Sequence, residues 1–387
     1  MNGLIASSSF ADITELTSAG LCDVGTSAPL LGRRRGRTFA SASEGGRAEE
    51  DASGKTAKIV VAAAMTTALA VANRVLYKVA LVPLNEYPFF LAQLTTFGYV
   101  LVYFSVLAAR KRMGIVTDEM LAIPKKRFVA MGALEAVSLA MGMVAATKLP
   151  GAIIPILSQT FIIWQLSLSS LILGTRYQPG QLFGALLVLA GVVIVVASGN
   201  DAGSAFQEAG KLYPALYTLS TVFPAASTIL KEGVFKEAKE KLKGSDLDLF
   251  VVNSFGSGFQ AIFVLLLLPF LSGIKGIPFS QLPSYLKAGT ACFFNTGDAV
   301  GCDGAPWLPF LYVASNLAFN VSALNLLKMS SAIVSSLTMT LAVPLTIFAF
   351  TFPIPYLGSP APLPPGFAIG SAVLILGLLA YNVSKRK

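Results

Sequence analysis

A few charged and amide side chains lie inside segments of the chain that are otherwise apolar. The first apolar segment carries Asn73, Arg74, Tyr77 and Lys78, and the third carries Glu135, the one carboxylate well inside it. Arg74 and Lys78 are four residues apart, so they share a face of a helix. Ionisable groups within membrane segments are costly, and they usually face a cavity or each other. This face therefore offers positive charge to an anionic solute.

Structural roles are open for the same side chains. Lys78 can extend its ammonium group to the membrane interface, and Arg74 can form an ion pair with Glu135. Glu135 can be the partner of Arg74, carry a proton for coupled transport, or bind an amine of a substrate. Lys231 and Glu232 end the sixth apolar segment, and the Lys, Glu and Phe residues that follow them favour an interfacial position for this pair.

Amide side chains form a second polar group in these segments. An amide offers both donors and acceptors, so it suits a solute with peptide-like groups, although hydrogen bonding between helices is an equally good role for any single one. A cavity lined by one or two cations, one carboxylate and many amides fits a zwitterionic or anionic solute. The candidate amides for binding are Gln93, Gln159, Asn253, Asn316 and Asn320, of which the last two share a helical face.

Several catalytic and energy-coupling motifs are absent from the sequence. The chain has no histidine, which removes His-based triads, His proton relays and HExxH zinc sites. It has no phosphate-binding GxxxxGK[ST] loop, so transport would draw on a gradient or on exchange instead of ATP. No aspartate lies inside an apolar segment, which leaves an intramembrane aspartyl enzyme without its carboxylates. We expect no enzyme activity, no cofactor and no metal site.

Apolar helices must position these side chains. The chain is 54% hydrophobic and 13% charged, whereas a soluble domain is about a quarter charged. Apolar runs of about 20 residues recur, and each can span ~30 Å of hydrocarbon. The short turn near Lys328 also allows a re-entrant pair in place of two spans. The sequence predicts ten transmembrane helices, at roughly 58–82, 88–109, 128–147, 151–173, 181–198, 212–235, 248–271, 306–327, 330–350 and 365–383.

Two similar stretches indicate an internal repeat. KLPGAIIPILSQT at Lys148–Thr160 matches KMSSAIVSSLTMT at Lys328–Thr340, and chance similarity between apolar sequences is the alternative. Gln93 corresponds to Asn253 at a smaller offset, so the second copy holds an insertion, which we place in the long loop 272–305. Ten spans divide into five and five, and an odd number in each copy inverts the second one. The predicted fold is therefore an all-α polytopic membrane protein with two inverted five-helix repeats.

Charged loops predict the orientation of these spans. Basic residues gather between the second and third spans, between the sixth and seventh spans, and at the C-terminus, which all lie on one face if there are ten spans. Lys and Arg are retained on the non-translocated side, so both termini are expected there. The net charge of +9 reflects this asymmetry, and we expect no nucleic-acid partner. The predicted organisation is a leading segment at 1–55, a first repeat at 56–200 and a second repeat at 201–387.

Residues 1–55 differ in composition from the rest of the chain. They are rich in Ser, Ala, Gly and Thr, they hold an RRRGR cluster at 33–37, and they lack the apolar core of a signal peptide. This composition is typical of an organellar transit peptide, although Asp12, Glu15 and Asp23 depart from the acid-poor pattern. A disordered cytosolic tail is the alternative.

Cys292 and Cys302 both fall in the loop 272–305, with nine residues between them. A disulfide would tie down this Gly- and Pro-rich loop, and free thiols are the alternative. Two thiols in a chain without histidine form a poor set of metal ligands. The aromatic residues and prolines around them indicate short helices that lie on the membrane surface.

Four stretches resemble the plant chloroquine-resistance-transporter-like (CRT-like) proteins. They are ANRVLYK at 72–78, YPFFLAQLTTFGY at 87–99, FVVNSFGSGFQ at 250–260 and CDGAP at 302–306. The resemblance extends over about 58–383. It implies the drug/metabolite transporter fold, with ten spans in two inverted repeats. The wider family can carry two disulfides in the cysteine-bearing loop, whereas the two cysteines here allow at most one.

The resemblance also implies a function, because the plant members are described as plastid-envelope thiol transporters. It implies a secondary transporter that moves glutathione and γ-glutamylcysteine by alternating access, within a lipid bilayer and with proton coupling as one option. A carboxylate of such a peptide could face Arg74. The plastid membrane is the expected location, with another endomembrane as the alternative. An exchanger of other organic anions or nucleotide sugars is the alternative function, and a channel or receptor-like membrane protein is an alternative of another class.

Overall fold

The structure is a computed structural model. It describes residues 40–146, 149, 153–198, 211–296, 301–357, 360, 363 and 365–385. The cluster at 33–37, the acidic residues Asp12, Glu15 and Asp23, and Lys148 lie outside these residues. The chain divides into two units, Met1–Gly54 and Lys55–Lys387, and the contacts below belong to the second unit.

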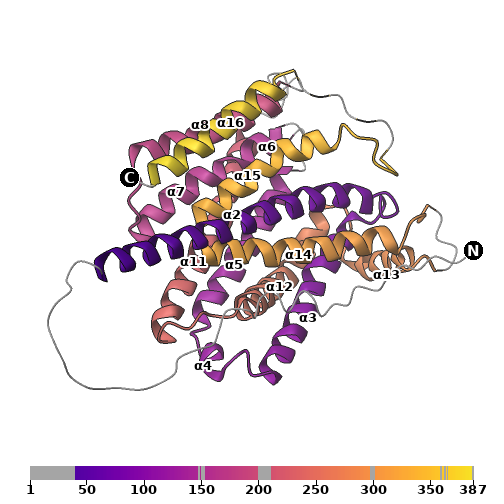
Figure 1. The fold of residues 1–387 in the computed structure, drawn as a ribbon. Coiled ribbons are helices and arrows are strands. Elements are labelled where there is room, and N and C mark those ends of the chain that lie inside the picture. The colour runs from indigo at the N-terminus through magenta and orange to yellow at the C-terminus, as the bar shows by residue number, and fades with distance from the viewer. Residues whose placement is uncertain are drawn as a thin grey trace, which may run out of the picture. The chain divides into compact units, whose positions relative to one another are not determined.

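The described part of the chain is helical and contains no strand (Figure 1). Its helices are α2 (Ala40–Ala80), α3 (Pro88–Arg112), α4 (Asp118–Leu121), α5 (Lys126–Ala146), α6 (Ile153–Ser158), α7 (Thr160–Leu173), α8 (Pro179–Ala197), α10 (Leu212–Ser220), α11 (Val222–Lys241), α12 (Leu249–Ile274), η1 (Phe279–Gln281), α13 (Leu282–Phe293), α14 (Trp307–Met329), α15 (Ala332–Ala349) and α16 (Phe367–Lys385).

Six of the described helices are long and apolar enough to cross a membrane: Thr56–Ala80 of α2, and α3, α5, α12, α14 and α15. Thr160–Leu173, Pro179–Val195 and Phe367–Tyr381 are shorter apolar helices. Helices therefore occur at each of the ten predicted spans. The turn near Lys328 joins α14 and α15, of 23 and 18 residues, which are each long and apolar enough to cross a membrane.

The fourth and sixth predicted spans are each interrupted, at Gln159 between α6 and α7 and at Thr221 between α10 and α11. At the second break, the hydroxyl of Thr221 donates to the carbonyl of Thr218 at 2.7 Å, and Pro224 lacks the N–H that would continue the helical hydrogen bonding. At the first break, the hydroxyl of Thr160 donates to the carbonyl of Leu157, also at 2.7 Å. Hydroxyl groups that compete for backbone carbonyls in this way bend or interrupt helices.

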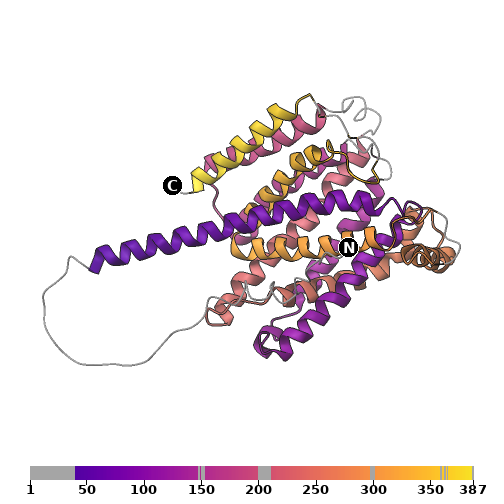
Figure 2. The ribbon, with the colours of Figure 1, turned by 45° about the vertical axis from the view of Figure 1, so that its right-hand side comes forward.

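α8 and α16 lie side by side and antiparallel in both views (Figures 1 and 2). Glycines make this close approach of the two backbones possible. A Cβ atom on Gly191 would lie 2.6 Å from the carbonyl oxygen of Gly370, and one on Gly184 would lie 2.7 Å from that of Gly377. Gly184 and Gly191 in α8, like Gly370 and Gly377 in α16, are seven residues apart, which places them on one face of the helix.

Two other antiparallel helix pairs are joined by polar contacts. Between α5 and α11, Arg127 forms an ion pair with Glu237 at 2.5 Å, and the hydroxyl of Ser138 in α5 donates to the carbonyl of Ser220, the last residue of α10, at 2.9 Å. Between α2 and α14, the hydroxyls of Thr66 and Ser322 lie 2.7 Å apart, and the rings of Tyr77 and Tyr312 have centroids 5.3 Å apart. These polar side chains therefore lie at the contacts between neighbouring helices.

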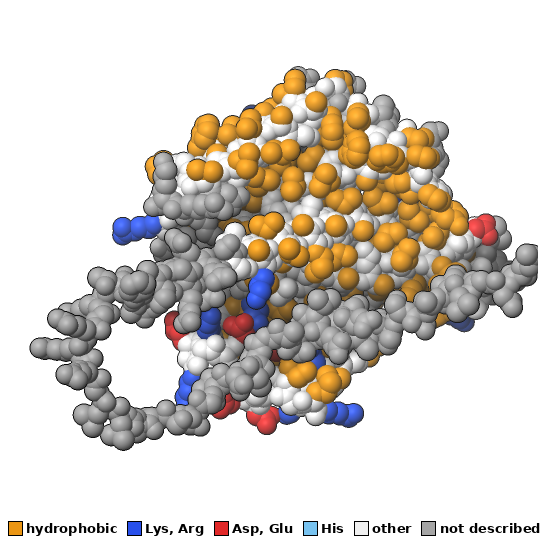
Figure 3. Space-filling model, in the orientation of Figure 1, with side chains coloured by type: hydrophobic (Ala, Val, Ile, Leu, Met, Phe, Trp, Pro, Cys, Tyr) orange, Lys and Arg blue, Asp and Glu red, His pale blue; other side chains and the backbone are white. Residues whose placement is uncertain are grey.

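Ion pairs gather where the basic loops were predicted. Arg110 at the end of α3 contacts Asp248 at 2.6 Å, and Lys328 at the end of α14 contacts Asp246 at 3.3 Å. The upper part of the face drawn in Figure 3 is mainly apolar, and most of the visible charged side chains gather in the lower part of the view. This distribution is the one expected for helices surrounded by hydrocarbon between two aqueous layers.

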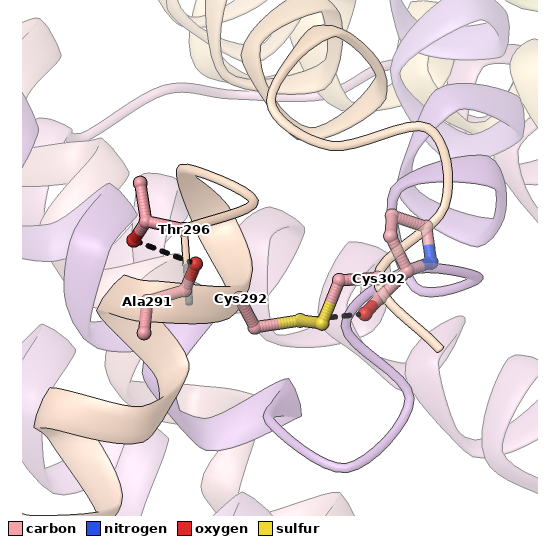
Figure 4. Close-up of a disulfide and its surroundings, with 5 residues drawn as sticks. Ala291, Cys292, Thr296 and Cys302 are labelled. Carbon is pink, nitrogen blue, oxygen red and sulfur yellow. Dashed lines mark hydrogen bonds between the residues drawn. A yellow bond between two sulfur atoms is a disulfide. The ribbon is translucent and has the colours of Figure 1, made fainter. Parts of the chain in front are cut away.

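The loop between α12 and α14 contains the helices η1 and α13 and a disulfide between Cys292 and Cys302 (Figure 4). The two Cα atoms lie 5.4 Å apart, and both cysteines are buried. The Sγ atom of Cys292 lies 3.1 Å from the carbonyl oxygen of Pro83. A Cβ atom on Gly289 would lie 2.7 Å from the ring of Phe90, so α13 packs closely against α3.

Candidate functional site

α2 presents the four polar residues predicted from the first apolar segment. Asn73 has a buried Oδ1 atom that finds no hydrogen-bond partner among the described residues. Arg74 is exposed and forms no ion pair with the described residues. The ammonium group of Lys78 lies 4.6 Å from the centroid of the Phe350 ring, just after α15. This cation–π contact is worth about 0.5–2 kcal/mol, and it joins Lys78 to the residue that follows α15.

A cluster of tyrosine and asparagine side chains joins α2, α3 and α14. The Oδ1 atom of Asn316 accepts hydrogen bonds from the hydroxyl of Tyr99 and from Nδ2 of Asn320, the latter at 2.5 Å. The Nδ2 atom of Asn316 donates to the hydroxyl of Tyr312 at 2.9 Å, and the Tyr312 ring packs on Tyr77. The structure thus brings together Tyr77, Asn316 and Asn320 of the predicted residues.

Tyr99 and Tyr312 were missed as members of this group. Tyr312 precedes Asn316 by four residues and shares its helical face, which is a signal that the sequence does contain. Tyr99 comes from α3, so its contact with Asn316 depends on the packing of two helices that are far apart in the chain. No spacing within one segment could have predicted it.

Glu135 is bound by α11 and not by Arg74. Its Oε1 atom accepts hydrogen bonds from Nζ of Lys231 at 2.6 Å and from Oγ of Ser227 at 2.7 Å. Ser227 and Lys231 are four residues apart on one face of α11. The Glu135 and Lys231 side chains are 22% and 25% exposed, so this ion pair lies mostly inside the protein.

Lys231 and Glu232 each contact another helix, and their expected position at the membrane interface stays a prediction. α11 continues to Lys241, and Lys231 pairs with Glu135 ten residues into α5. The Glu232 side chain is buried, and its two oxygens contact Lys236 and the backbone N–H of Ala332, each at 2.7 Å. The charged residues after these two extend the helix beyond the apolar segment instead of ending it.

The remaining predicted amides lie apart from these two clusters. Within the part of the chain that the structure describes, the buried Oε1 of Gln93 in α3 and the buried Nδ2 of Asn253 in α12 have no hydrogen-bond partner. Gln159 lies at the break between α6 and α7, where its Nε2 donates to the hydroxyl of Ser158 at 3.3 Å. Buried polar atoms ordinarily find partners, so Gln93 and Asn253 retain hydrogen-bonding capacity.

An apolar groove of about 470 Å³ separates parts of α3 and α12. It has no charged group with which to pair the charges of a zwitterionic or anionic solute, so it does not form the candidate binding site. Its lining residues are Phe97, Val100, Phe104, Phe255, Gly258, Phe259, Ala261, Ile262 and Leu265.

Two charged groups outside the membrane-spanning segments have shifted pKa values. Burial lowers the pKa of Lys125, whose ammonium group donates to the carbonyl of Ile123 at 3.1 Å and lies 4.0 Å from the centroid of the Phe255 ring. A hydrogen bond from Lys241 lowers the pKa of Glu237, desolvation opposes this shift, and the charge of Arg127 adds to it.

Several known proteins are similar in sequence to most of this chain. Protein CLT2, chloroplastic, of Arabidopsis thaliana is 56% identical over 343 residues, which cover 88% of this chain and 80% of the relative. Protein CLT1, chloroplastic, of the same plant is 52% identical, over 89% of this chain and 77% of the relative. The chloroquine resistance transporter of Plasmodium falciparum is 23% identical, over 73% of this chain and 68% of the relative.

A sequence model of the family described as CRT-like, chloroquine-resistance transporter-like, matches residues 59–381. These residues include every side chain of the two polar clusters. The chloroplastic names of the plant relatives and the apolar helices place the protein in a plastid membrane, which it crosses several times. The chain is therefore a transporter that belongs to the CRT-like family.

Proposed function

We propose that the protein is a secondary transporter of thiol peptides, glutathione and γ-glutamylcysteine, across the plastid envelope. It works by alternating access between two inverted five-helix repeats, at 56–200 and 201–387, with the insertion at 272–305 in the second repeat. The residues at 1–55 are the transit segment in this proposal. The substrate-binding residues are drawn from Asn73, Arg74, Tyr77, Lys78, Gln93, Glu135, Gln159, Asn253, Asn316 and Asn320.

The pairing of the helices supports the inverted repeats. The first and third helices of the first half are α2 and α5, and those of the second half are α11 and α14. α2 contacts α14 through Thr66 and Ser322, and α11 contacts α5 through Ser227 and Glu135. Each first helix therefore packs antiparallel on the third helix of the other half. The last helices of the two halves, α8 and α16, also pack together. A two-fold axis in the membrane plane relates such contacts.

The observation that carries the proposal is the position of the two polar clusters at these equivalent contacts. Asn316 in α14 and Glu135 in α5 occupy nearly the same place in the repeat, and each is held by side chains from the other half. A solute between the halves would meet amides and phenols at one contact and an ion pair at the other. Glutathione carries two carboxylates, one ammonium group and two peptide bonds, so it can use both sets of partners.

Uptake of labelled glutathione into vesicles that contain the purified protein tests the proposal. We expect saturable uptake that rises when unlabelled glutathione is loaded inside the vesicles, because an exchanging carrier returns faster with a substrate bound. Uptake equal to that of empty vesicles would disprove the proposal. Uptake without saturation or stimulation from the opposite side would instead indicate a channel.

Substrate class and energy coupling need separate measurements. Competition by γ-glutamyl peptides, without competition by nucleotide sugars or sugar phosphates, is the result expected for a thiol-peptide transporter. The reverse order of competition would support the exchanger of other organic anions. An imposed pH gradient that accelerates uptake would support coupling to protons, and unchanged uptake would remove proton coupling from the proposal.

A further inference from the structure

Glu135 and Lys231 form an ion pair between helices of the two proposed repeats, inside a bundle of apolar helices. Nζ of Lys231 lies 2.6 Å from Oε1 of Glu135, and Oγ of Ser227 donates to the same oxygen at 2.7 Å. Both charged side chains are about three-quarters buried. Charges removed from water in this way are costly unless all of their donors and acceptors are satisfied.

The pair is only partly satisfied. A lysine ammonium group has three N–H donors, and the contacts within the described residues use one of them. A carboxylate has two acceptor oxygens, but both hydrogen bonds to Glu135 fall on Oε1. Oε2 accepts none from the part of the chain that the structure describes. The pair can therefore accept one more anionic group, at Lys231, and one more cationic group, at Glu135.

Charge balance restricts the ligand that fits this pair. A single added ion would leave a net charge in a medium of low dielectric constant, which is strongly unfavourable. A ligand with one ammonium group and one carboxylate leaves the site neutral. An α-amino acid zwitterion carries both groups on a single carbon atom, so it can contact two partners that are themselves adjacent.

We propose that Lys231 and Glu135 together bind the α-amino acid zwitterion of a γ-glutamyl group. Lys231 binds its carboxylate, Glu135 binds its ammonium group, and Ser227 holds the carboxylate of Glu135 in place. This inference rests on the proposed function and names the residues that recognise the γ-glutamyl end of the substrate. In γ-glutamyl peptides the α-amino and α-carboxylate groups are both free on one carbon, whereas an α-linked isomer uses its α-carboxylate in the peptide bond. The site therefore selects the γ linkage.

The first test compares glutathione with two analogues that each lack one charged group. Glutaryl-Cys-Gly lacks the amine, and 4-aminobutyryl-Cys-Gly lacks the α-carboxylate. The purified protein in vesicles should take up each analogue about 10- to 100-fold less efficiently than glutathione, the effect of one charge-assisted hydrogen bond. Glu135→Gln should lose the preference for glutathione over glutaryl-Cys-Gly but keep the preference over 4-aminobutyryl-Cys-Gly. Lys231→Gln should show the opposite pattern.

Two further variants separate recognition from folding. The double variant Glu135→Gln/Lys231→Gln removes both charges at once, so it leaves no unpaired buried charge and should fold while losing both preferences. Lys239→Gln changes an exposed lysine of the same helix that forms no ion pair with the described residues, and it should keep both preferences. Preferences that persist in the single and double variants would overturn the inference while leaving glutathione transport intact.

A binding measurement keeps the inference separate from transport. Glutathione should raise the melting temperature of the purified protein, and the double variant should lose this shift. If the shift is present and depends on both residues but vesicles show no uptake, the transport proposal fails and the binding site stands. If glutathione produces no shift that depends on Glu135 and Lys231, and uptake shows no preference that depends on them, the inference is wrong.

Discussion

The buried carboxylate of Glu232 accepts a hydrogen bond from the backbone N–H of Ala332, across 2.7 Å. Ala332 is the first residue of α15, and the first N–H groups of a helix have no partner within the helix. A carboxylate at this end also interacts favourably with the helix dipole. Lys236 holds the other carboxylate oxygen at 2.7 Å. Glu232 thus links α11 to the start of α15.

Removal of this carboxylate should destabilise the protein. Glu232→Ala leaves a buried N–H without an acceptor, which costs about 1–3 kcal/mol, and Glu232→Gln should cost less because its amide oxygen can still accept. The melting temperature of the purified protein measures both effects. Glu240→Ala, at an exposed position of the same helix, is the matched control and should change little. An alanine variant as stable as the wild type would show that Glu232 does not hold α15.

Gly191 and Gly98 should respond in opposite ways to the same substitution. A Cβ atom on Gly191 would lie 2.6 Å from the carbonyl oxygen of Gly370, whereas one on Gly98 would meet nothing within 4 Å. Gly191→Ala should therefore separate α8 from α16 and lower the melting temperature. Gly98→Ala should leave it unchanged or raise it, because alanine favours a helix over glycine by roughly 1 kcal/mol. Equal effects of the two substitutions would contradict the close packing of α8 and α16.

The helices could be predicted from the sequence because long apolar runs are themselves the physical requirement for crossing a membrane. The breaks at Gln159 and Thr221 were missed, since hydropathy does not register a hydroxyl that competes for a backbone carbonyl. Pro224 was the available signal for the second break. The two breaks also contact each other, with the hydroxyls of Thr160 and Thr221 3.0 Å apart.

The partner of Glu135 could not be predicted from spacing. Arg74 and Lys231 are both cations that could pair with a carboxylate, and only the antiparallel packing of α5 against α11 decides between them. The polar residues of α2 were correctly grouped on one helix, but their contacts with Tyr312 and Phe350 come from α14 and from the end of α15. Contacts within a helix follow from its period, whereas contacts between helices require the fold.

The disulfide between Cys292 and Cys302 should stabilise the loop that contains α13. It closes a short ring, with a sequence separation of 10, and restricting the unfolded chain in this way is worth on the order of 2–3 kcal/mol. The double variant Cys292→Ser/Cys302→Ser should melt at a lower temperature than the wild type. A reducing agent should lower the melting temperature of the wild type and leave that of the double variant unchanged. If the reducing agent lowers the melting temperature of both proteins, its effect does not come from this disulfide.

Acid should weaken the contacts of Glu237 on the basic face. Its hydrogen bond with Lys241, and to a lesser degree the charge of Arg127, lower its pKa from the ordinary value of 4.5. A lowered pKa means that the stabilisation is fully present above the ordinary value and is lost as the pH falls through the folded-state value. The melting temperature of the wild type should therefore decline more steeply below pH 4.5 than that of Glu237→Gln. Parallel curves for the two proteins would show that the contacts contribute nothing.

Arg74 should affect transport much more than stability. It lies on the polar face of α2 beside Asn73, and it forms no ion pair with the residues that the structure describes, so its removal leaves no buried carboxylate unpaired. Arg74→Ala should reduce the uptake of anionic peptide by about 10-fold or more, the effect of one lost charge-assisted contact, with little change in melting temperature. Arg74→Lys should retain part of the uptake, because it keeps the charge and loses the planar set of donors.

Arg112→Ala is the matched control for Arg74→Ala. Arg112 is also exposed and without an ion pair in the described part of the chain, but it lies at the last position of α3 on the basic face. Its removal should leave both uptake and melting temperature unchanged. If Arg74→Ala lowers uptake and melting temperature together, Arg74 supports the fold and not the substrate. If Arg112→Ala lowers uptake as much as Arg74→Ala does, the general positive charge of the protein attracts the anion, and a specific contact on α2 is excluded.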